Sequence, residues 1–233
     1  FYGTALTRVG DLQGAGRAYI RSHTLDPDCL DVYWRGLPAL ITSGNASSAW
    51  AWLRELQSRF PNHWDAAMRA AYALLSLGEP GAAVEAAARG VQLAPHVRQA
   101  WGDFGNVLYR AGRYEEALDA FQRAVSICSG QTAALVLECR LWMARTLKAL
   151  GRHAEATKTI REVISEARAR SDQDPAYMVV QGRALLEMED YAGAQRALQR
   201  ALNAGAWSAR WDLEQLRERL ASGTAGKGGP EDE

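Results

Sequence analysis

Histidine and cysteine are the residues best able to bind a metal ion or to act as a catalytic base or nucleophile, and this chain has few of each. The histidines and cysteines are His23, His63, His96, His153, Cys29, Cys128 and Cys139. Their spacings match no common metal-site pattern. We interpret the histidines as surface or capping residues and the cysteines as small buried residues of a reducing compartment. The sequence therefore predicts no metal and no cofactor.

Paired carboxylates could serve as a general acid and base, and two groups qualify by spacing: Glu115 with Glu116, and Glu187 with Glu189 and Asp190. Helical surfaces carry many such pairs, so we interpret them as solvated faces. The chain has no glycine-rich loop that leads into a helix with Lys-Ser or Lys-Thr, as a phosphate-binding loop does. These patterns predict a protein that is not an enzyme.

The elements that must position any binding residues are indicated by three ladders of one residue type, which share one constant spacing. The ladders are Gly10, Gly44, Gly78 and Gly112; Ala15, Ala49, Ala83 and Ala117; and Pro27, Pro61 and Pro95. Glycine suits a left-handed turn after a helix, alanine suits a close helix crossing, and proline suits the end of a helix. Three ladders in one phase predict stacked helical hairpins.

We expect an all-α, right-handed superhelical solenoid of antiparallel helix pairs, forming a single repeat domain over residues 1–221. The predicted units are 1–29, 30–63, 64–97, 98–131, 137–170 and 175–208, followed by a capping helix at 209–221 and a disordered tail at 222–233. The chain opens inside a first helix without an initiator methionine, so we expect it to be a piece of a longer protein.

Several positions depart from the regular pattern. After Gly112 the next turn position is Gly151 and the one after that is Glu189, and both steps are longer than the constant step before them. We place the extra residues near 129–134 and 164–169. A glutamate resists the left-handed conformation, so we expect the turn at Glu189 to close differently. Pro38 lies inside a first helix and is expected to kink it. Ala87 occupies a slot that is bulky in other units, so neighbours are expected to fill the space.

Composition limits the classes of partner. Lys plus Arg and Asp plus Glu each number 27, for a formal net charge of +0, and 48% of the residues are hydrophobic. A neutral chain has no general attraction to nucleic acid or to an anionic membrane. No apolar run approaches the roughly 20 residues of a membrane span. We therefore expect neither a nucleic-acid partner nor a transmembrane segment.

The pattern resembles the tetratricopeptide repeat over nearly the whole chain. The best match is the unit 98–131, through Trp101, Phe104, Gly105, Leu108, Tyr114, Ala117, Phe121 and Ala124. The resemblance implies a solenoid whose first helices line a concave groove, and a non-enzymatic scaffold that holds a peptide or helix of a partner protein there.

The family geometry implies which residues face the groove: Trp34, Arg35, Met68, Arg69, Tyr72, Asn106, Tyr109, Arg110, Arg145, Lys148 and Arg183, with Trp142 beside them. Acidic residues are expected mostly at the groove edge: Asp31, Asp65, Asp103, Glu138 and Glu187. Arginine binds carboxylates with paired hydrogen bonds and aromatic rings stack on apolar groups, so we expect a partner with acidic residues or a free C-terminus. Gly102 stands where a co-chaperone carboxylate clamp has lysine, which disfavours that subtype.

Three alternatives stay open beside the scaffold. The chain could be the recognition or oligomerisation arm of a larger enzyme. A helical-repeat reader of RNA is disfavoured by the neutral charge and irregular repeats. Self-association through the tryptophans Trp50, Trp52, Trp207 and Trp211 is a further hypothesis. We expect a cytoplasmic location, with a periplasmic or membrane-associated one, through a segment absent from this sequence, as the alternative.

Overall fold

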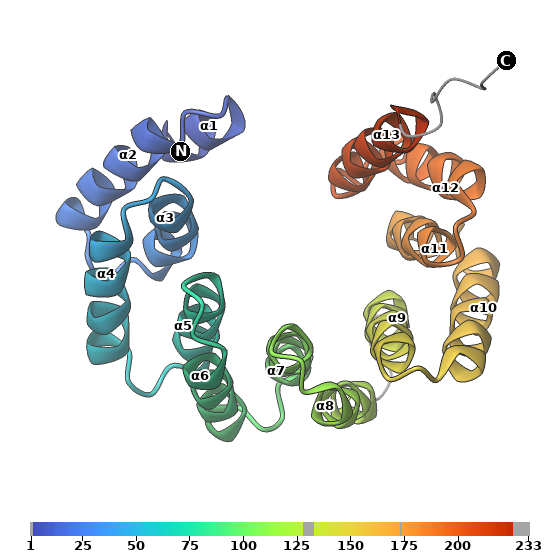
Figure 1. Ribbon diagram of the computed structural model, residues 1–233, viewed down its shortest axis with the longest axis horizontal. Helices are drawn as coiled ribbons and strands as arrows, with labels where there is room; N and C mark the ends of the chain where they lie inside the picture. Colours follow the sequence, from blue (N-terminus) through green and yellow to red (C-terminus); the bar gives the residue numbers. More distant parts are fainter. Residues whose placement is uncertain (1, 128–132, 173, 226–233) are drawn as a thin grey trace, which may run out of the picture. The chain divides into compact units, whose positions relative to one another are not determined.

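The structure is a computed structural model that describes residues 2–127, 133–172 and 174–225. The described residues form helices and no strands, as Figure 1 shows. The helices are α1 (Tyr2–Arg8), α2 (Leu12–Leu25), α3 (Leu30–Thr42), α4 (Ala46–Arg59), α5 (Trp64–Ser76), α6 (Pro80–Leu93), α7 (Arg98–Arg110), α8 (Tyr114–Ile127), α9 (Ala133–Ala149), α10 (His153–Ala169), α11 (Pro175–Glu187), α12 (Tyr191–Asn203) and α13 (Ala209–Ala225).

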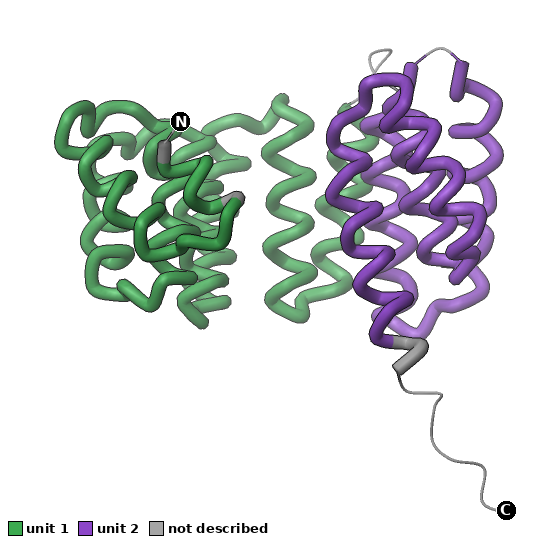
Figure 2. The backbone as a smooth tube through the Cα atoms, turned by 90° about the horizontal axis from the view of Figure 1, so that it is seen from above, with its two compact units in different colours: residues 1–127 green, residues 128–233 purple. Residues whose placement is uncertain are grey.

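The chain divides into two compact units, which are coloured separately in Figure 2. Unit 1 covers residues 1–127 and unit 2 covers residues 128–233. The division falls after Ile127, where the constant spacing of the ladders ends. The extra residues expected near 129–134 lie largely outside the described residues. The second expected extension is confirmed, because α10 has 17 residues whereas α4, α6 and α8 each have 14.

Within each unit, consecutive helices form hairpins. In unit 1 the first helices α3, α5 and α7 are neighbours, and the second helices α4, α6 and α8 lie on the other side of them (Figure 1). In unit 2, α9 and α11 are neighbours in the same way, with α10 and α12 as their second helices. The prediction of an all-α solenoid of helix pairs is confirmed.

Glycine on a first helix gives room for a large side chain on the second helix of the same hairpin. A Cβ atom added at any of these glycines would come within 3 Å of the ring or side chain that faces it. The pairs are Gly3 with Tyr19, Gly36 with Trp52, Gly105 with Phe121, and Gly182 with Leu198. The interval from the glycine to its partner is the same in all four pairs, so one short spacing predicts the contact in four hairpins.

In the hairpin of α5 and α6 the glycine and the large side chain are exchanged: the glycine lies on the second helix and the large side chain on the first. Ala87 is buried where other units carry a bulky residue, and Met68 reaches from α5 to Gly90, which lies one turn further along α6. Neighbours therefore fill the space beside Ala87, as expected. The consequence is that Met68 is only 1% exposed and belongs to the core.

The turn at Glu189 is formed like the glycine turns, so the expectation that it closes differently is wrong. Glu189 has φ 61°, close to the 75° to 85° of the five ladder glycines from Gly10 to Gly151. The following amide, Asp190, donates to the carbonyl of Leu185 at 3.0 Å, just as Asn45 donates to Leu40 at 2.9 Å after Gly44. Both turns are therefore Schellman motifs, and the backbone hydrogen bonds hold Glu189 in a conformation that its side chain disfavours.

The C-terminal helix is longer than expected. α13 begins at Ala209, where the capping helix was expected to begin, and continues to Ala225, beyond its expected end at residue 221. Ser222 donates from its hydroxyl to the carbonyl of Arg219 at 3.0 Å within the last turns of this helix. The rest of the predicted tail, residues 226–233, lies outside the described residues. Pro38 lies within α3, and the helix runs on to Thr42.

Candidate functional site

The first-helix face of unit 1 is defined by the exposed or half-buried side chains of α3, α5 and α7 that the sequence predicted. They are Trp34, Arg35, Arg69, Tyr72, Asn106, Tyr109 and Arg110. Arg35 and Arg69 are separated by one full step of the ladders, so the repeat itself places them at matching positions on neighbouring helices. Trp34 is 46% exposed, which is high for so large an apolar ring.

Arg69 and Tyr72 of α5 both contact Trp34 of α3 on this face. The guanidinium carbon of Arg69 lies 4.5 Å from the centroid of the Trp34 ring. The Tyr72 ring meets Trp34 edge-on, with centroids 6.4 Å apart. Two N–H groups of Arg69 donate to the same carboxylate oxygen of Asp65, at 2.9 and 2.6 Å. The ion pair fixes the guanidinium, and the guanidinium in turn supports the exposed indole.

Tyr72 also joins α5 to α7. Its hydroxyl donates to the Oδ1 atom of Asp103 at 3.0 Å. Burial raises the pKa of the Asp103 carboxyl, and the charge of Asp65 raises it further, whereas the hydrogen bond from Tyr72 acts in the opposite direction. Burial likewise raises the pKa of the Tyr72 phenol far above its ordinary value. This face therefore includes a part-buried polar contact between α5 and α7.

Arg110 is the cation of this face that remains available. It is exposed at the end of α7 and, among the described residues, forms no ion pair. Its charge lowers the pKa of Tyr72, against the larger effect of burial, which places it within electrostatic reach of that phenol. Arg35, by contrast, pairs with Asp31 at 3.2 Å. Tyr72 thus contacts the exposed Trp34 ring and is also affected by the charge of Arg110.

The predicted basic residues of unit 2 are engaged by carboxylates of unit 2. Arg145 donates to Glu187 at 2.7 Å, and Lys148 lies 3.3 Å from the same carboxylate. The Arg145 guanidinium also lies 4.4 Å from the centroid of the Trp142 ring. These contacts make the face of α9 and α11 an internally neutralised surface.

Arg183 is held by two carboxylates from different helices. It bonds to Glu138 of α9 and, at 3.0 Å, to Asp212 of α13. Burial raises the pKa of Asp212, and the charge of Arg183 opposes that rise. The ion pairs tie the C-terminal helix to the first helices of unit 2. Asp212 is not among the predicted site residues, because it lies on a helix that was predicted only as a cap.

One prediction about this face needs correction. Met68 is buried against Gly90, so it cannot contact a partner on the surface. The acidic residues expected at the groove edge pair with the predicted basic residues or, for Asp103, with Tyr72. The i to i+4 spacing of Asp31 to Arg35 and of Asp65 to Arg69 is a signal that could have found two of these pairs. The pairing of Arg183 with Asp212 has no such signal.

The histidines differ from one another. The His63 ring accepts a hydrogen bond from the amide of Ala66 at 3.4 Å and so caps α5, as predicted. His23 is half-buried instead: it stacks on Trp52 with ring centroids 4.5 Å apart and bonds to the Tyr33 hydroxyl at 3.0 Å. Trp52 is buried, so it is not an exposed residue for self-association. In the part of the chain that the structure describes, no three metal-binding side chains cluster.

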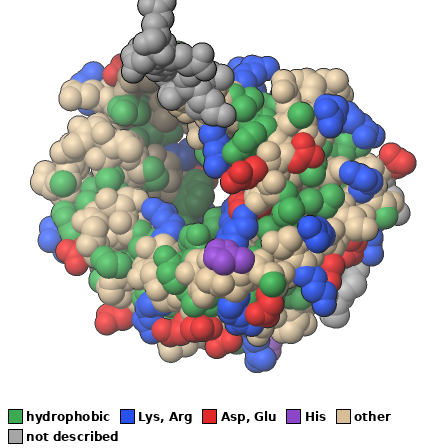
Figure 3. Space-filling model, turned by 45° about the vertical axis from the view of Figure 1, so that its right-hand side comes forward, with side chains coloured by type: hydrophobic (Ala, Val, Ile, Leu, Met, Phe, Trp, Pro, Cys, Tyr) green, Lys and Arg blue, Asp and Glu red, His purple; other side chains and the backbone are tan. Residues whose placement is uncertain are grey.

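Charges of both signs are interspersed over the face drawn in Figure 3. This distribution agrees with the equal numbers of acidic and basic residues. None of the described helices combines the length and apolarity that crossing a bilayer requires.

Comparison with known proteins gives the family. One family model described as "Tetratricopeptide repeat" matches residues 96–165, and a second with the same description matches residues 38–97. The two matches are contiguous and together cover more than half of the chain. The chain belongs to the tetratricopeptide repeat family. The predicted resemblance is therefore confirmed.

Solved structures agree on the fold. A tetratricopeptide repeat protein from Parabacteroides merdae has a TM-score of 0.57 at 18% identity, with 92% of this chain and 80% of that chain covered. A structure of MamA has a TM-score of 0.53 at 20% identity, with 74% and 98% covered. The PilF protein of Pseudomonas aeruginosa has a TM-score of 0.50 at 17% identity, with 84% and 92% covered. At these identities the likeness shows the repeat fold alone.

One curated relative resembles part of the chain. The human protein O-mannosyl-transferase TMTC1 is 36% identical over 91 residues, which are 39% of this chain and 10% of that protein. The chain thus spans about a tenth of the length of this relative. The tetratricopeptide fold supports a protein-interaction scaffold in general, and proteins of this repeat class are generally non-catalytic.

Proposed function

We propose that this tetratricopeptide repeat protein is a non-enzymatic adaptor that binds a segment of a partner protein along the first-helix face of unit 1. The observation that carries the proposal is the exposed Trp34 ring, which Arg69 and Tyr72 contact. When a partner covers a large apolar ring that is exposed to water, the removal of that apolar surface from water favours binding.

The partner segment carries an apolar side chain and a carboxylate. Trp34 offers a flat apolar surface, and Arg110 offers a guanidinium without an ion pair among the described residues. Tyr72 touches Trp34 and lies within the electrostatic reach of Arg110, so both features act on one short stretch of a partner. An acidic side chain or a free C-terminal carboxylate meets this requirement.

The paired cations contribute less to affinity than the sequence suggests. A partner carboxylate that binds Arg69 or Arg145 must first compete with Asp65 or Glu187. Such an exchange replaces one ion pair with another and gains little. Arg110 therefore provides most of the charge selectivity on unit 1.

Affinity capture from the source cells tests the proposal. We expect wild-type protein to retain a partner that the double variant Trp34→Ala, Arg110→Glu loses. Arg17→Glu supplies the matched control, because Arg17 is an exposed arginine on the second helix α2. Equal recovery of the same partner by all three proteins, each shown to be folded by circular dichroism, would contradict the proposal.

A second candidate rests on the similarity to a much longer protein. The matched relative is named as a mannosyltransferase, and this chain covers about a tenth of it. On this candidate the chain is the recognition arm of a larger enzyme. An antibody against unit 1 tests it: on a blot of the source cells, a polypeptide far larger than 233 residues supports this candidate, and one of about that length opposes it.

A further inference from the structure

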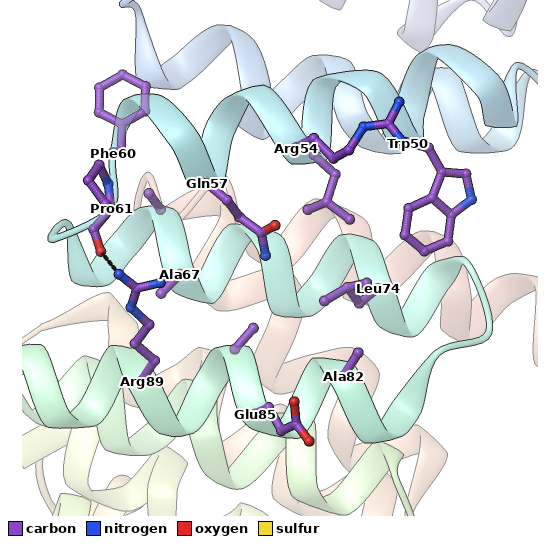
Figure 4. A pocket seen from close by; sticks show the side chains of 13 residues that line it. Trp50, Arg54, Gln57, Phe60, Pro61, Ala67, Leu74, Ala82, Glu85 and Arg89 are labelled. Atoms are coloured by element: carbon purple, nitrogen blue, oxygen red, sulfur yellow. Dashed lines mark hydrogen bonds between the residues drawn. The ribbon is translucent and has the colours of Figure 1, made fainter.

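Unit 1 has an open pocket that the first-helix face does not include. It lies between the second helices α4 and α6, has a floor formed by α5 and a volume of about 370 Å³, and is drawn in Figure 4. We call this pocket the α4–α6 trough. Its position on the second helices separates it from Trp34 and Arg110, which lie on first helices.

Small residues of α5 and α6 contribute to the open space of the trough, which also has larger lining side chains such as Trp50 and Phe60. Ala82 and Ala86 of α6 and Ala66 and Ala67 of α5 line it, with Leu53 of α4 as its larger aliphatic wall. Methyl groups on α6 are too short to fill the space up to α4. Covering the apolar surface that is open to water in this trough is favourable, because it removes that surface from water.

Polar side chains stand at the rim. Gln57 points into the space between α4 and α6, and Arg89 donates to the carbonyl of Pro61 at one end (Figure 4). Arg54 is exposed and forms no ion pair among the described residues, and Glu85 stands on the opposite helix. The rim therefore has a positive side chain on α4, Arg54, and one negative and one positive side chain on α6, Glu85 and Arg89.

Unit 2 presents a complementary feature at the start of α13. Trp207 is 76% exposed and Trp211 is 63% exposed, one helical turn apart in sequence. Arg210 and Glu214 flank them and pair with each other at 3.0 Å, with both side chains half or more exposed. Two neighbouring tryptophans this exposed are typical of an interaction surface, where tryptophan and arginine are enriched.

We propose that an indole from the Trp207–Trp211 surface of one copy of this chain inserts into the α4–α6 trough of a second copy. The size fits, since a cavity of roughly 150 Å³ accepts benzene and the trough is more than twice as large. The charges fit as well: Glu214 can approach Arg54 while Arg210 approaches Glu85.

The contact is head-to-tail, because the two surfaces are different and belong to different units. A head-to-tail contact leaves one trough and one tryptophan surface free at the ends, so chains can grow. Two tryptophans bury about 150–250 Å² each. Such a contact lies at or below the small end of specific interfaces, so the association is weak and depends on concentration.

Light scattering on the purified full chain tests the proposal. We expect the wild-type mass to rise above that of a monomer as the concentration increases. The variant Trp207→Ala, Trp211→Ala and the trough-filling variant Ala86→Leu should each remain monomeric. An equimolar mixture of the two variants should form a one-to-one dimer and nothing larger, because each retains one intact surface.

Two controls keep this test decisive. Arg54→Glu weakens the same contact without filling the trough, and it replaces Ala86→Leu if that variant does not fold. Trp34→Ala removes a tryptophan from the first-helix face and should associate as the wild type does, which separates this inference from the proposed function. A wild-type protein that is monomeric at every concentration, or either surface variant associating like the wild type, would overturn the proposal.

Discussion

Asp103 shows at the scale of single residues how a buried charge is tolerated on the candidate face. Its carboxylate accepts the hydrogen bond of Tyr72, although burial raises its pKa. A carboxyl with a raised pKa holds its proton more tightly in the native state than in the unfolded state. The native state is therefore penalised as pH rises from the ordinary aspartate pKa of about 4 through the raised value.

The variant Asp103→Asn tests this statement. Asparagine keeps a carbonyl oxygen for the Tyr72 hydroxyl but has no charge to desolvate. We expect the unfolding free energy of the variant, minus that of the wild type, to increase as pH rises from about 4 to 7. Urea unfolding followed at several pH values measures the difference. A difference that decreases over the same range would contradict the raised pKa.

At Glu189 the backbone adopts the left-handed conformation, which a glutamate side chain disfavours. It adopts φ 61° at a position where the ladder supplies glycine elsewhere. Since glycine has little cost in the left-handed region but a larger entropy in the unfolded chain, we expect Glu189→Gly to stabilise the protein by about 0.5–1 kcal/mol. Denaturant unfolding measures it, and Gly151→Ala, at the matching turn, should have the opposite sign.

At the scale of helices, the hairpins depend on which glycine faces a neighbour. Gly105 faces the Phe121 ring, and a Cβ atom added there would lie 2.7 Å from it. Gly102, one turn earlier on α7, has no atom within 4 Å of such a Cβ atom. Replacing glycine by alanine is therefore expected to change the stability of the protein in opposite directions at these two positions of α7.

We expect Gly105→Ala to destabilise the protein by about 1–3 kcal/mol, because the Phe121 ring must move in a packed core. Gly102→Ala should stabilise it by about 0.5–1 kcal/mol, because alanine is the better helix former and meets nothing. Thermal unfolding of both variants compares them directly. Destabilisation by both to the same extent would show that helix propensity, and not the contact with Phe121, decides the outcome.

For the whole molecule, the sequence predicted the hairpins because their signal is local and repeated. Turn glycines, crossing alanines and terminal prolines recur with one constant step, and the helices of unit 1 follow them. The extended α10 in unit 2 was predicted from the same ladder, through the longer step to Glu189.

The candidate site was predicted less well, because its chemistry depends on which side chains meet across helices. The sequence placed Met68 on the surface, whereas the small Gly90 draws it into the core. It predicted Arg145 and Arg183 as partner-binding residues of the groove, whereas Glu187 and Asp212 pair with them from 42 and 29 residues away. These two separations in sequence do not recur along the chain. The repeated spacing of the ladders therefore does not predict the ion pairs.

The central claim is that a partner segment lies on the first-helix face of unit 1, and photo-crosslinking in the source cells tests it most directly. A photoreactive phenylalanine analogue replaces Trp34, Arg110 or, as the control on α2, Arg17. The account predicts that Trp34 and Arg110 crosslink to the same partner protein and that Arg17 does not. Crosslinking of that partner from Arg17 alone, with none from the first-helix face, would contradict it.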